Sequence, residues 1–240
     1  MPVAPGKGEG APGTGPKFRC AVLLSAAMRI TGGTFRSRAL VAPRGQETRP
    51  TSDRVREALF SMLVSDGIFG DEPGPCVLDL YAGSGALGLE AISRGARAAV
   101  LVENARPALT AIRENVRALD VEDKVTVVPL RVDRALGTLG TIEGPFDLVL
   151  VDPPYAEVRA RAFGDVLAKA AELIAPGGTL VLEHASSDEP ASPPGLVLDR
   201  RRRHGDTTVS LFRSPADGLT RPTIGENESD ESVEEDEAGK

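Results

Sequence analysis

The chain has 240 residues, of which 41% are hydrophobic and 26% are charged, and its formal net charge is −7. This length can build one sizeable α/β domain but not two full catalytic domains. Its 2 cysteines are too few for a disulfide framework or a zinc cluster, and no apolar run has membrane-spanning length. We therefore expect a cytoplasmic monomer that binds no metal and no membrane.

The charge is distributed unevenly along the chain. Residues 216–240 hold nine carboxylates against two basic residues, so this segment carries −7 and residues 1–215 are neutral. We expect residues 215–240 to form a disordered acidic tail, and residues 1–27, which are rich in Gly and Pro, a disordered leader. Residues 28–56 contain seven arginines against two acidic residues. This excess suggests a polyanionic partner, although an ordinary solvated arginine surface is the alternative.

The predicted elements begin with an amphipathic helix that Thr51 or Ser52 can cap and that continues to Gly67. Thereafter, short aliphatic runs typical of strands alternate with segments of helical periodicity. The expected helices cover 87–94, 108–119, 135–139 and 160–174, and the expected strands cover 76–80, 99–103, 124–128, 146–151, 179–183, 196–200 and 207–212.

This order predicts an α/β fold with a doubly wound, mostly parallel, seven-stranded sheet. Strands such as 146–151 are apolar along their whole length, so helices should cover both faces of the sheet. The last two strands have no helix between them. They should form an antiparallel C-terminal hairpin at the edge of the sheet.

A glycine-rich loop follows the first predicted strand. Gly83, Gly85 and Gly88 have the spacing G-x-G-x-x-G, which allows a tight turn and a close approach of the backbone to a ligand. Nicotinamide and flavin enzymes share this spacing, and Glu103 at the end of the next strand could hold a ribose diol in all of them. Asp79 favours S-adenosylmethionine, because a carboxylate suits its cationic sulfonium and amino groups and would repel a pyrophosphate. The alternative is that Asp79 only caps the glycine turn.

A second loop, Asp152-Pro153-Pro154-Tyr155, follows the strand 146–151 at the edge where open α/β sheets bind ligands. A ring-attached amine is a weak nucleophile, and Asp152 and the Pro153 carbonyl could accept its hydrogen bonds and orient its lone pair. The prolines would stiffen the loop, and Tyr155 would stack on a base swung out of its helix. An ordinary turn after a strand is the alternative.

Three further motifs carry a resemblance to a known family: MRITGG at 28–33, RPTSDRVRE at 49–57 and HGDT at 204–207. With the two loops, they make residues 28–213 resemble the bacterial 16S rRNA (guanine(966)-N(2))-methyltransferase family, called RsmD. The resemblance implies a Rossmann-like class I methyltransferase acting on the exocyclic N2 of one guanine of 16S rRNA, in the 30S subunit or an assembly intermediate. It also implies a methyltransferase domain at 28–214, in which an arm and helix at 28–66 face the RNA.

The loops and the resemblance together assign residues to three roles. The expected catalytic residues are Asp152, Pro153, Pro154 and Tyr155. The expected contacts to S-adenosylmethionine are Asp79, Tyr81, Gly83, Ser84, Gly85, Glu103 and Val132. The expected RNA-binding residues are Arg36, Arg38, Arg49, Thr51, Asp53, Arg54 and Arg56. Arg131, near the expected adenine position, and His204 depart from the family pattern.

Two other functions remain open at this point. The methyl acceptor could be a DNA base or a protein glutamine, since related loops serve those amines, although glutamine enzymes usually carry Asn at the position of Asp152. The chain could also be a non-catalytic assembly factor that binds rRNA through residues 28–56 and keeps a vestigial cofactor pocket.

Overall fold

The computed structural model describes residues 28–43, 51–142 and 144–216. The predicted leader, nearly all of the predicted tail and Arg49 lie outside these ranges, so the expected domain limits stay predictions. Within the ranges described, no helix is both long enough and apolar enough to cross a membrane.

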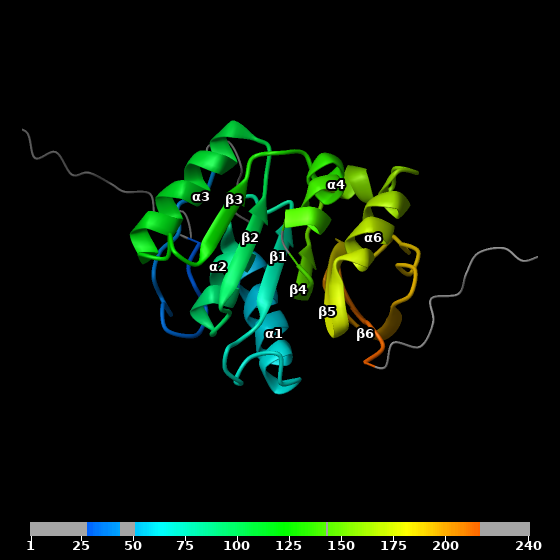
Figure 1. The fold of residues 1–240 in the computed structure, drawn as a ribbon, viewed down its shortest axis with the longest axis horizontal. Coiled ribbons are helices and arrows are strands. Elements are labelled where there is room, and N and C mark those ends of the chain that lie inside the picture. Colours follow the sequence, from blue (N-terminus) through cyan, green and yellow to red (C-terminus); the bar gives the residue numbers. More distant parts are fainter. Residues whose placement is uncertain (1–27, 44–50, 143, 217–240) are drawn as a thin grey trace, which may run out of the picture.

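A seven-stranded sheet forms the centre of the molecule (Figure 1). Its order is β3-β2-β1-β4-β5-β7-β6, and among the described strands only β7 runs antiparallel to its neighbours. The strands are β1 (Cys76–Leu80), β2 (Ala98–Val102), β3 (Val125–Val128), β4 (Phe146–Val151), β5 (Ile174–Ala185), β6 (Val197–His204) and β7 (Thr207–Arg213). The predicted mostly parallel sheet with a C-terminal edge hairpin is therefore confirmed.

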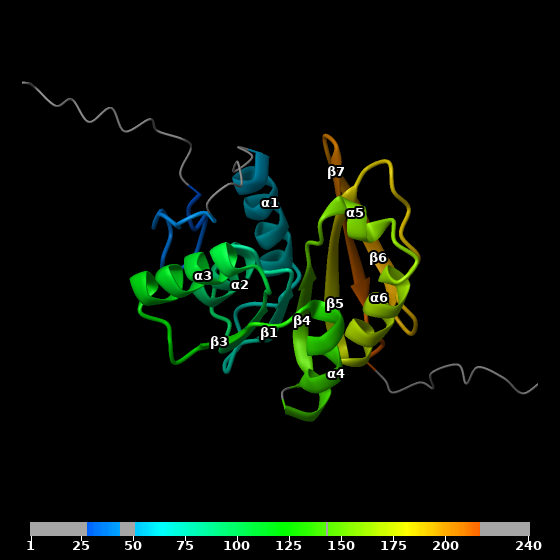
Figure 2. The same ribbon diagram turned by 90° about the horizontal axis from the view of Figure 1, so that it is seen from above.

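Helices cover both faces of this sheet (Figure 2). The helices are α1 (Thr51–Ser65), α2 (Ala86–Ser93), α3 (Arg106–Leu119), α4 (Val132–Ile142), α5 (Tyr155–Val158) and α6 (Phe163–Glu172). Alternate strand residues enter two cores: Leu148 packs with the α1 residue Leu59, whereas its neighbour Val149 packs with the α6 residue Leu167. Each such buried aliphatic side chain contributes about 2 kcal/mol of hydrophobic stabilisation, which explains why the strands are apolar throughout.

The predicted helix at 160–174 has different limits in the structure. Pro154 precedes the short helix α5, and α6 begins only at Phe163, whose side chain is buried. Ile174 already belongs to β5, where it pairs with Phe146. A proline next to a helix start favours this early turn, and tertiary pairing rather than helical periodicity decides the state of Ile174.

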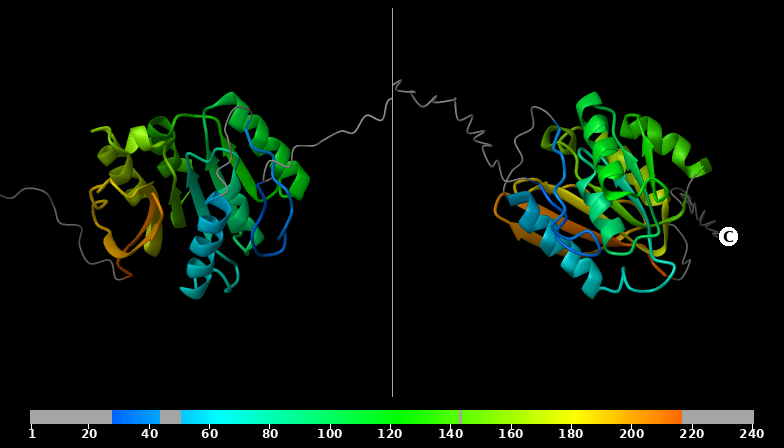
Figure 3. Two further views of the ribbon diagram at one scale, coloured as in Figure 1. Left: turned by 180° about the vertical axis from the view of Figure 1, so that it is seen from behind. Right: turned by 90° about the vertical axis from the view of Figure 1, so that its left-hand side faces the viewer.

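Helix α1 crosses one face of the sheet between the β6–β7 hairpin and residues 28–43, which we call the arm (Figure 3). Asp66, just beyond the end of α1, forms ion pairs of 3.2 Å with Arg200 of β6 and with Arg213 at the end of β7. The other end of α1 lies at the carboxyl edge of the parallel strands, where Val55 lines a pocket. Residues 51–57 of the motif at 49–57, which begin α1, therefore lie at the same edge of the sheet as the glycine-rich loop and the Asp152 loop.

The arm is anchored on α2 and α3 by buried hydrogen bonds. The backbone N–H and the hydroxyl of Thr31 each donate to Glu90 of α2 at 2.7 Å. The Asn115 side chain of α3 bonds both backbone groups of Val41, and it also donates to the Ser84 carbonyl at 2.9 Å. The arm is therefore joined directly to the glycine-rich loop.

Candidate active site

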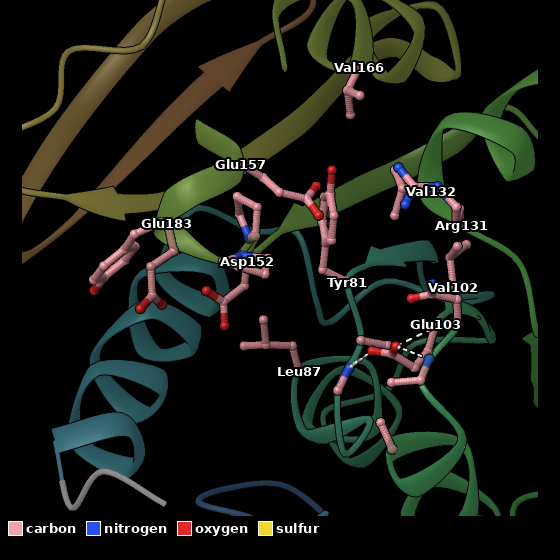
Figure 4. A pocket seen from close by; sticks show the side chains of 18 of the residues that line it. Tyr81, Leu87, Val102, Glu103, Arg131, Val132, Asp152, Glu157, Val166 and Glu183 are labelled. Carbon is pink, nitrogen blue, oxygen red and sulfur yellow. Dashed lines mark hydrogen bonds between the residues drawn. The ribbon is translucent and has the colours of Figure 1, made fainter. Parts of the chain in front are cut away.

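The two predicted loops meet at one pocket at the carboxyl edge of the sheet (Figure 4). The last residues of β1 and β4, Leu80 and Val151, are register partners in neighbouring parallel strands. Neighbouring strands lie about 4.8 Å apart, so the loops that follow begin side by side. The pocket has a volume of about 1000 Å³, and α1, α6 and β5 complete its walls. This volume is enough for a nucleoside-sized ligand with a second group beside it.

The glycine-rich loop turns tightly from β1 into α2. Gly85 precedes α2 with φ of 80°, a left-handed backbone conformation that residues with a side chain rarely adopt. A Cβ on Gly88 would lie 2.2 Å from Leu101 Cδ2 and 3.2 Å from Asp79 Oδ2. These glycines let α2 pack against β1 and β2, and they bring the backbone of Gly83 and Ser84 to the pocket wall.

Asp79 lies beneath this loop and is fully buried. Its Oδ2 accepts a hydrogen bond from the Gly88 N–H at 2.9 Å, whereas its Oδ1 has no hydrogen-bond partner among the described residues. Burial is the main cause that raises the pKa of Asp79 to about 8; the Gly88 hydrogen bond opposes this rise, and the charges of Asp152 and Glu103 add to it. Asp79 caps the glycine turn and does not line the pocket itself, whereas its predicted contact to the cofactor stays a prediction.

Glu103, at the end of β2, faces the pocket and holds the neighbouring backbone in place. Its Oε2 accepts the Gly83 N–H at 2.9 Å, and its Oε1 accepts the N–H groups of Asn104 and Ala105 at 2.7 Å each. A carboxylate has about four lone-pair sites and three are occupied here, so Oε2 can still accept a hydrogen bond from a ligand hydroxyl. Glu103, a predicted cofactor residue, thus links the glycine-rich loop to the segment that follows β2 at one end of the pocket.

Tyr81 and Val132 form the wall opposite Glu103. Tyr81 has a left-handed backbone with φ of 63°, which turns its ring towards α5. Burial and a hydrogen bond with Glu157 raise the pKa of the Tyr81 phenol. Val132 is buried, and the neighbouring Arg131 side chain is exposed and pairs with Asp133 at 3.1 Å. The Val132 side chain therefore offers the pocket an apolar surface.

The second loop presents Asp152 at the pocket (Figure 4). Asp152 is exposed, Pro153 behind it is buried, and Pro154 is exposed. Tyr155 does not belong to the loop as expected but is the first residue of α5. Its hydroxyl lies 3.0 Å from Thr207 Oγ1 at the start of β7, so a hydrogen bond fixes the ring from the hairpin side.

Further charged residues of the pocket were not predicted from the sequence. Glu183 of β5 and Asp152 point into the same part of the pocket, and Glu157 and Lys169 line it from α5 and α6. Glu183 lies near the carboxyl end of a parallel strand, which is the same signal that identified Glu103. Glu157 and Lys169 carry no comparable signal, because their positions depend on where α5 and α6 begin.

The predicted RNA-binding residues fall into two groups. Arg36, Arg38 and Arg54 are exposed, and the Arg38 guanidinium also donates to the Ala118 carbonyl. Arg56 is only 4% exposed and contacts Asp53 at 2.8 Å and Glu90 at 3.5 Å.

The burial of Arg56 argues against the direct RNA contact expected of it and indicates that it supports the arm instead. Asp53 is half-buried in the same ion network. Thr51 opens α1, but its side chain lies outside what the structure describes.

The sheet order, the glycine turn and the acidic pocket define a Rossmann-like class I methyltransferase. The solved structure of the Escherichia coli protein yhhF superposes with a TM-score of 0.66 at 32% identity, covering 79% of this chain and 99% of that chain. A hypothetical protein of Thermus thermophilus superposes with a TM-score of 0.63 at 34% identity, covering 77% and 98% of the two chains.

Sequence comparison identifies the family within this class. The family model described as Conserved hypothetical protein 95 matches residues 28–213. The ribosomal RNA small subunit methyltransferase D of Escherichia coli K12 is 34% identical over 194 residues, which covers 81% of this chain and 93% of that protein. The protein of the same name from Haemophilus influenzae is 32% identical, with coverage of 78% and 94%. The chain belongs to this family, ribosomal RNA small subunit methyltransferase D, to which its motifs point.

Proposed function

We propose that the protein transfers a methyl group from S-adenosylmethionine to the exocyclic N2 of one guanine of 16S rRNA, at position 966 in the bacterial reference numbering. The observation that carries this proposal is the pairing of Leu80 with Val151, which sets the glycine-rich loop beside Asp152 at one pocket. The names of the relatives support rRNA as the substrate, and the protein would meet it in the cytoplasm, in the 30S subunit or an assembly intermediate.

The pocket suits a cationic methyl donor. One carboxylate oxygen of Asp79 has no hydrogen-bond partner among the described residues, and the charges of Asp152 and Glu103 act on it, so a positive group nearby would be stabilised. When bound, S-adenosylmethionine supplies a methyl carbon made electrophilic by the positive sulfur. We assign its ribose to Glu103, its carboxylate to the backbone of Gly83 and Ser84 at the start of α2, and its adenine to Val132.

The second loop suits the acceptor amine. The N2 lone pair of guanine is delocalised into the ring, so the amine needs acceptors that hold its N–H groups and orient it. Asp152 and the Pro153 carbonyl provide these acceptors, and the Thr207 hydrogen bond holds Tyr155 where its ring can stack on a base. A new N–C bond replaces the methyl–sulfur bond, and the proton that N2 loses passes to Asp152.

The test is a methyl-transfer assay with Asp152→Ala on small-subunit rRNA, with DNA and ribosomal protein as competing acceptors. We expect the rate to fall by about 100-fold or more, because a general base typically contributes about 10²–10⁴-fold. Binding of S-adenosylhomocysteine should change little.

The matched control is Asp165→Ala, which removes a pocket carboxylate of α6 that belongs to neither loop. Its transfer rate should stay within a few-fold of wild type. Full transfer by the Asp152→Ala variant, or a preference for DNA or protein as acceptor, would refute the proposed reaction.

A further inference from the structure

The edge strand β6 carries three consecutive arginines that the proposed reaction does not use. Arg201, Arg202 and Arg203 are all exposed, and within the described part of the chain none of them forms an ion pair with a carboxylate. The preceding Arg200 differs, because Asp66 and Asp199 neutralise it at 3.2 and 3.1 Å. We call Arg201, Arg202 and Arg203 the arginine edge.

The arginine edge projects cations to both sides of the sheet. Arg202 pairs with Val209, whose side chain enters the core beneath α1, so Arg202 emerges on the α1 side. Arg201 pairs with Ser210, and together with Arg203 it lines a hollow on the opposite side, which Asp188, paired with Arg159, and Glu189 also line. The feature is therefore a cationic ridge, which fits the phosphates that line a groove of folded RNA better than it fits one small anion.

The ridge ends beside the proposed guanine site. His204 pairs with Thr207, which holds the Tyr155 hydroxyl at 3.0 Å, and Arg203 occupies the next pair along the hairpin. At about 3.4 Å per residue, the three arginines lie within about 10 Å of that pair along β6. Figure 2 shows the tip of this hairpin at the same edge of the sheet as the first turn of α1, which carries Arg54.

A simpler explanation is that charged side chains keep an exposed edge strand from pairing with another chain. One or two charges would be enough for that purpose, whereas three adjacent cations that form no ion pair among the described residues repel one another. Edge protection also does not explain why the three arginines lie next to Thr207. Both observations favour a polyanionic partner at this edge.

We propose that the arginine edge binds phosphates of the rRNA next to the target guanine, and that Arg54 with the arm binds the RNA on the other side of the pocket. This inference rests on the proposed function, because it assumes that rRNA enters the pocket from this side. It adds β6 to an RNA surface that the sequence placed only in residues 28–66.

The test compares Arg202→Gln/Arg203→Gln with the control Arg97→Gln/Lys124→Gln. The control removes two cations from the start of β2 and β3, at the opposite edge of the sheet. Binding of a small-subunit rRNA fragment is measured against salt concentration. The arginine-edge variant should bind about ten-fold more weakly, and the slope of log K against log salt should fall by roughly 1.5, as expected for two lost phosphate contacts.

Other readouts separate this inference from the proposed function. Binding of S-adenosylhomocysteine and the transfer rate at saturating RNA should stay near wild type, and Arg202→Lys/Arg203→Lys should recover most of the RNA affinity. If the double Gln variant aggregates, the single variant Arg203→Gln is measured instead, and its slope of log K against log salt should change by about half as much. Unchanged RNA affinity and slope beside normal methyl transfer would overturn the arginine edge alone, whereas wild-type protein that fails to methylate rRNA would overturn the reaction.

Discussion

At the scale of single residues, the account depends on three carboxylates that act on one another around the pocket. Asp79 is buried, one of its oxygens has no hydrogen-bond partner in the part of the chain that the structure describes, and the charges of Asp152 and Glu103 act on it. A positive group in the pocket would lower the pKa of Asp79 and stabilise its ionised form, so the arrangement favours a cationic ligand. Perturbed carboxylates of this kind cluster at functional sites, and Asp79 combines this property with its cap of the glycine turn.

This arrangement predicts a pH dependence of stability that Asp79 controls. The pKa of Asp79 rises from 3.8 to about 8 on folding, so between these values the folded state binds more protons than the unfolded state. The free energy of unfolding should therefore fall as the pH rises through this window. Asp79→Asn removes this titration, so between about pH 6 and pH 9 its Tm should decline less than that of wild type.

Thermal denaturation monitored by circular dichroism measures both profiles. Asp123→Asn, at an exposed turn before β3, is the control and should follow wild type. Parallel profiles for wild type and Asp79→Asn would contradict the raised pKa of Asp79.

The sequence predicts those residues whose role follows from a strand end. Glu103 and Asp152 were identified because each follows an aliphatic strand, and both line the pocket. Arg56 was expected at the RNA, but its burial is set by Glu90, which is 34 positions away and on another helix. Periodicity along α1 contains no information about that partner, so only tertiary packing could reveal the supporting role of Arg56.

At the scale of elements, an ion network ties the arm, α1 and α2 into one unit. Glu90 of α2 is fully buried and accepts hydrogen bonds from Thr31 of the arm, while Arg94, which caps the end of α2, contacts it at 2.9 Å and Arg56 of α1 at 3.5 Å. The arm and α1, which carry the expected RNA-binding residues, thus share one carboxylate of α2. The arm can hold a fixed position beside the pocket for this reason.

Removing that carboxylate should loosen the whole unit. Glu90→Gln leaves Arg56 and Arg94 without their buried anion, and breaking a buried ion pair from one side typically costs about 3–5 kcal/mol. We expect a loss of about 3 kcal/mol in the free energy of unfolding, measured by urea denaturation. Glu114→Gln, an exposed change on α3, should alter it by less than about 0.5 kcal/mol. A similarly small effect at Glu90 would show that the network does not hold the arm.

Helices and strands were predicted correctly where a pattern along the sequence, such as an aliphatic run, sets their limits. β1 and β4 have the limits expected from their aliphatic runs, and α1 begins at Thr51, close to its expected start, whereas the predicted cap stays a prediction. The helix expected at 160–174 was wrong in its limits because Tyr155–Val158 forms α5 and Ile174 pairs with Phe146. Pairing across the sheet outweighs helical periodicity at such positions, and a single sequence does not display it.

At the scale of the whole molecule, the fold sets the cofactor loop and the acceptor loop on neighbouring central strands. The arm and α1 lie on one side of the resulting pocket, and the β6–β7 hairpin carries the arginine edge on the other (Figure 3). The fold class and the pocket could be predicted from the sequence, because they follow from strand order and strand ends. The arginine edge could not be predicted, since its position beside the proposed guanine site depends on the pairing of His204 with Thr207 and on the hydrogen bond between Thr207 and Tyr155.

The central claim is that this pocket methylates one guanine of 16S rRNA at N2. The most direct measurement is mass spectrometry of rRNA nucleosides, mapped to position, from cells that lack the gene and from the same cells complemented with wild type or with Asp152→Ala. We predict that N2-methylguanosine at position 966 is absent without the gene, returns with wild type and does not return with Asp152→Ala. Methylation that persists without the gene, or that returns with Asp152→Ala, would contradict the account.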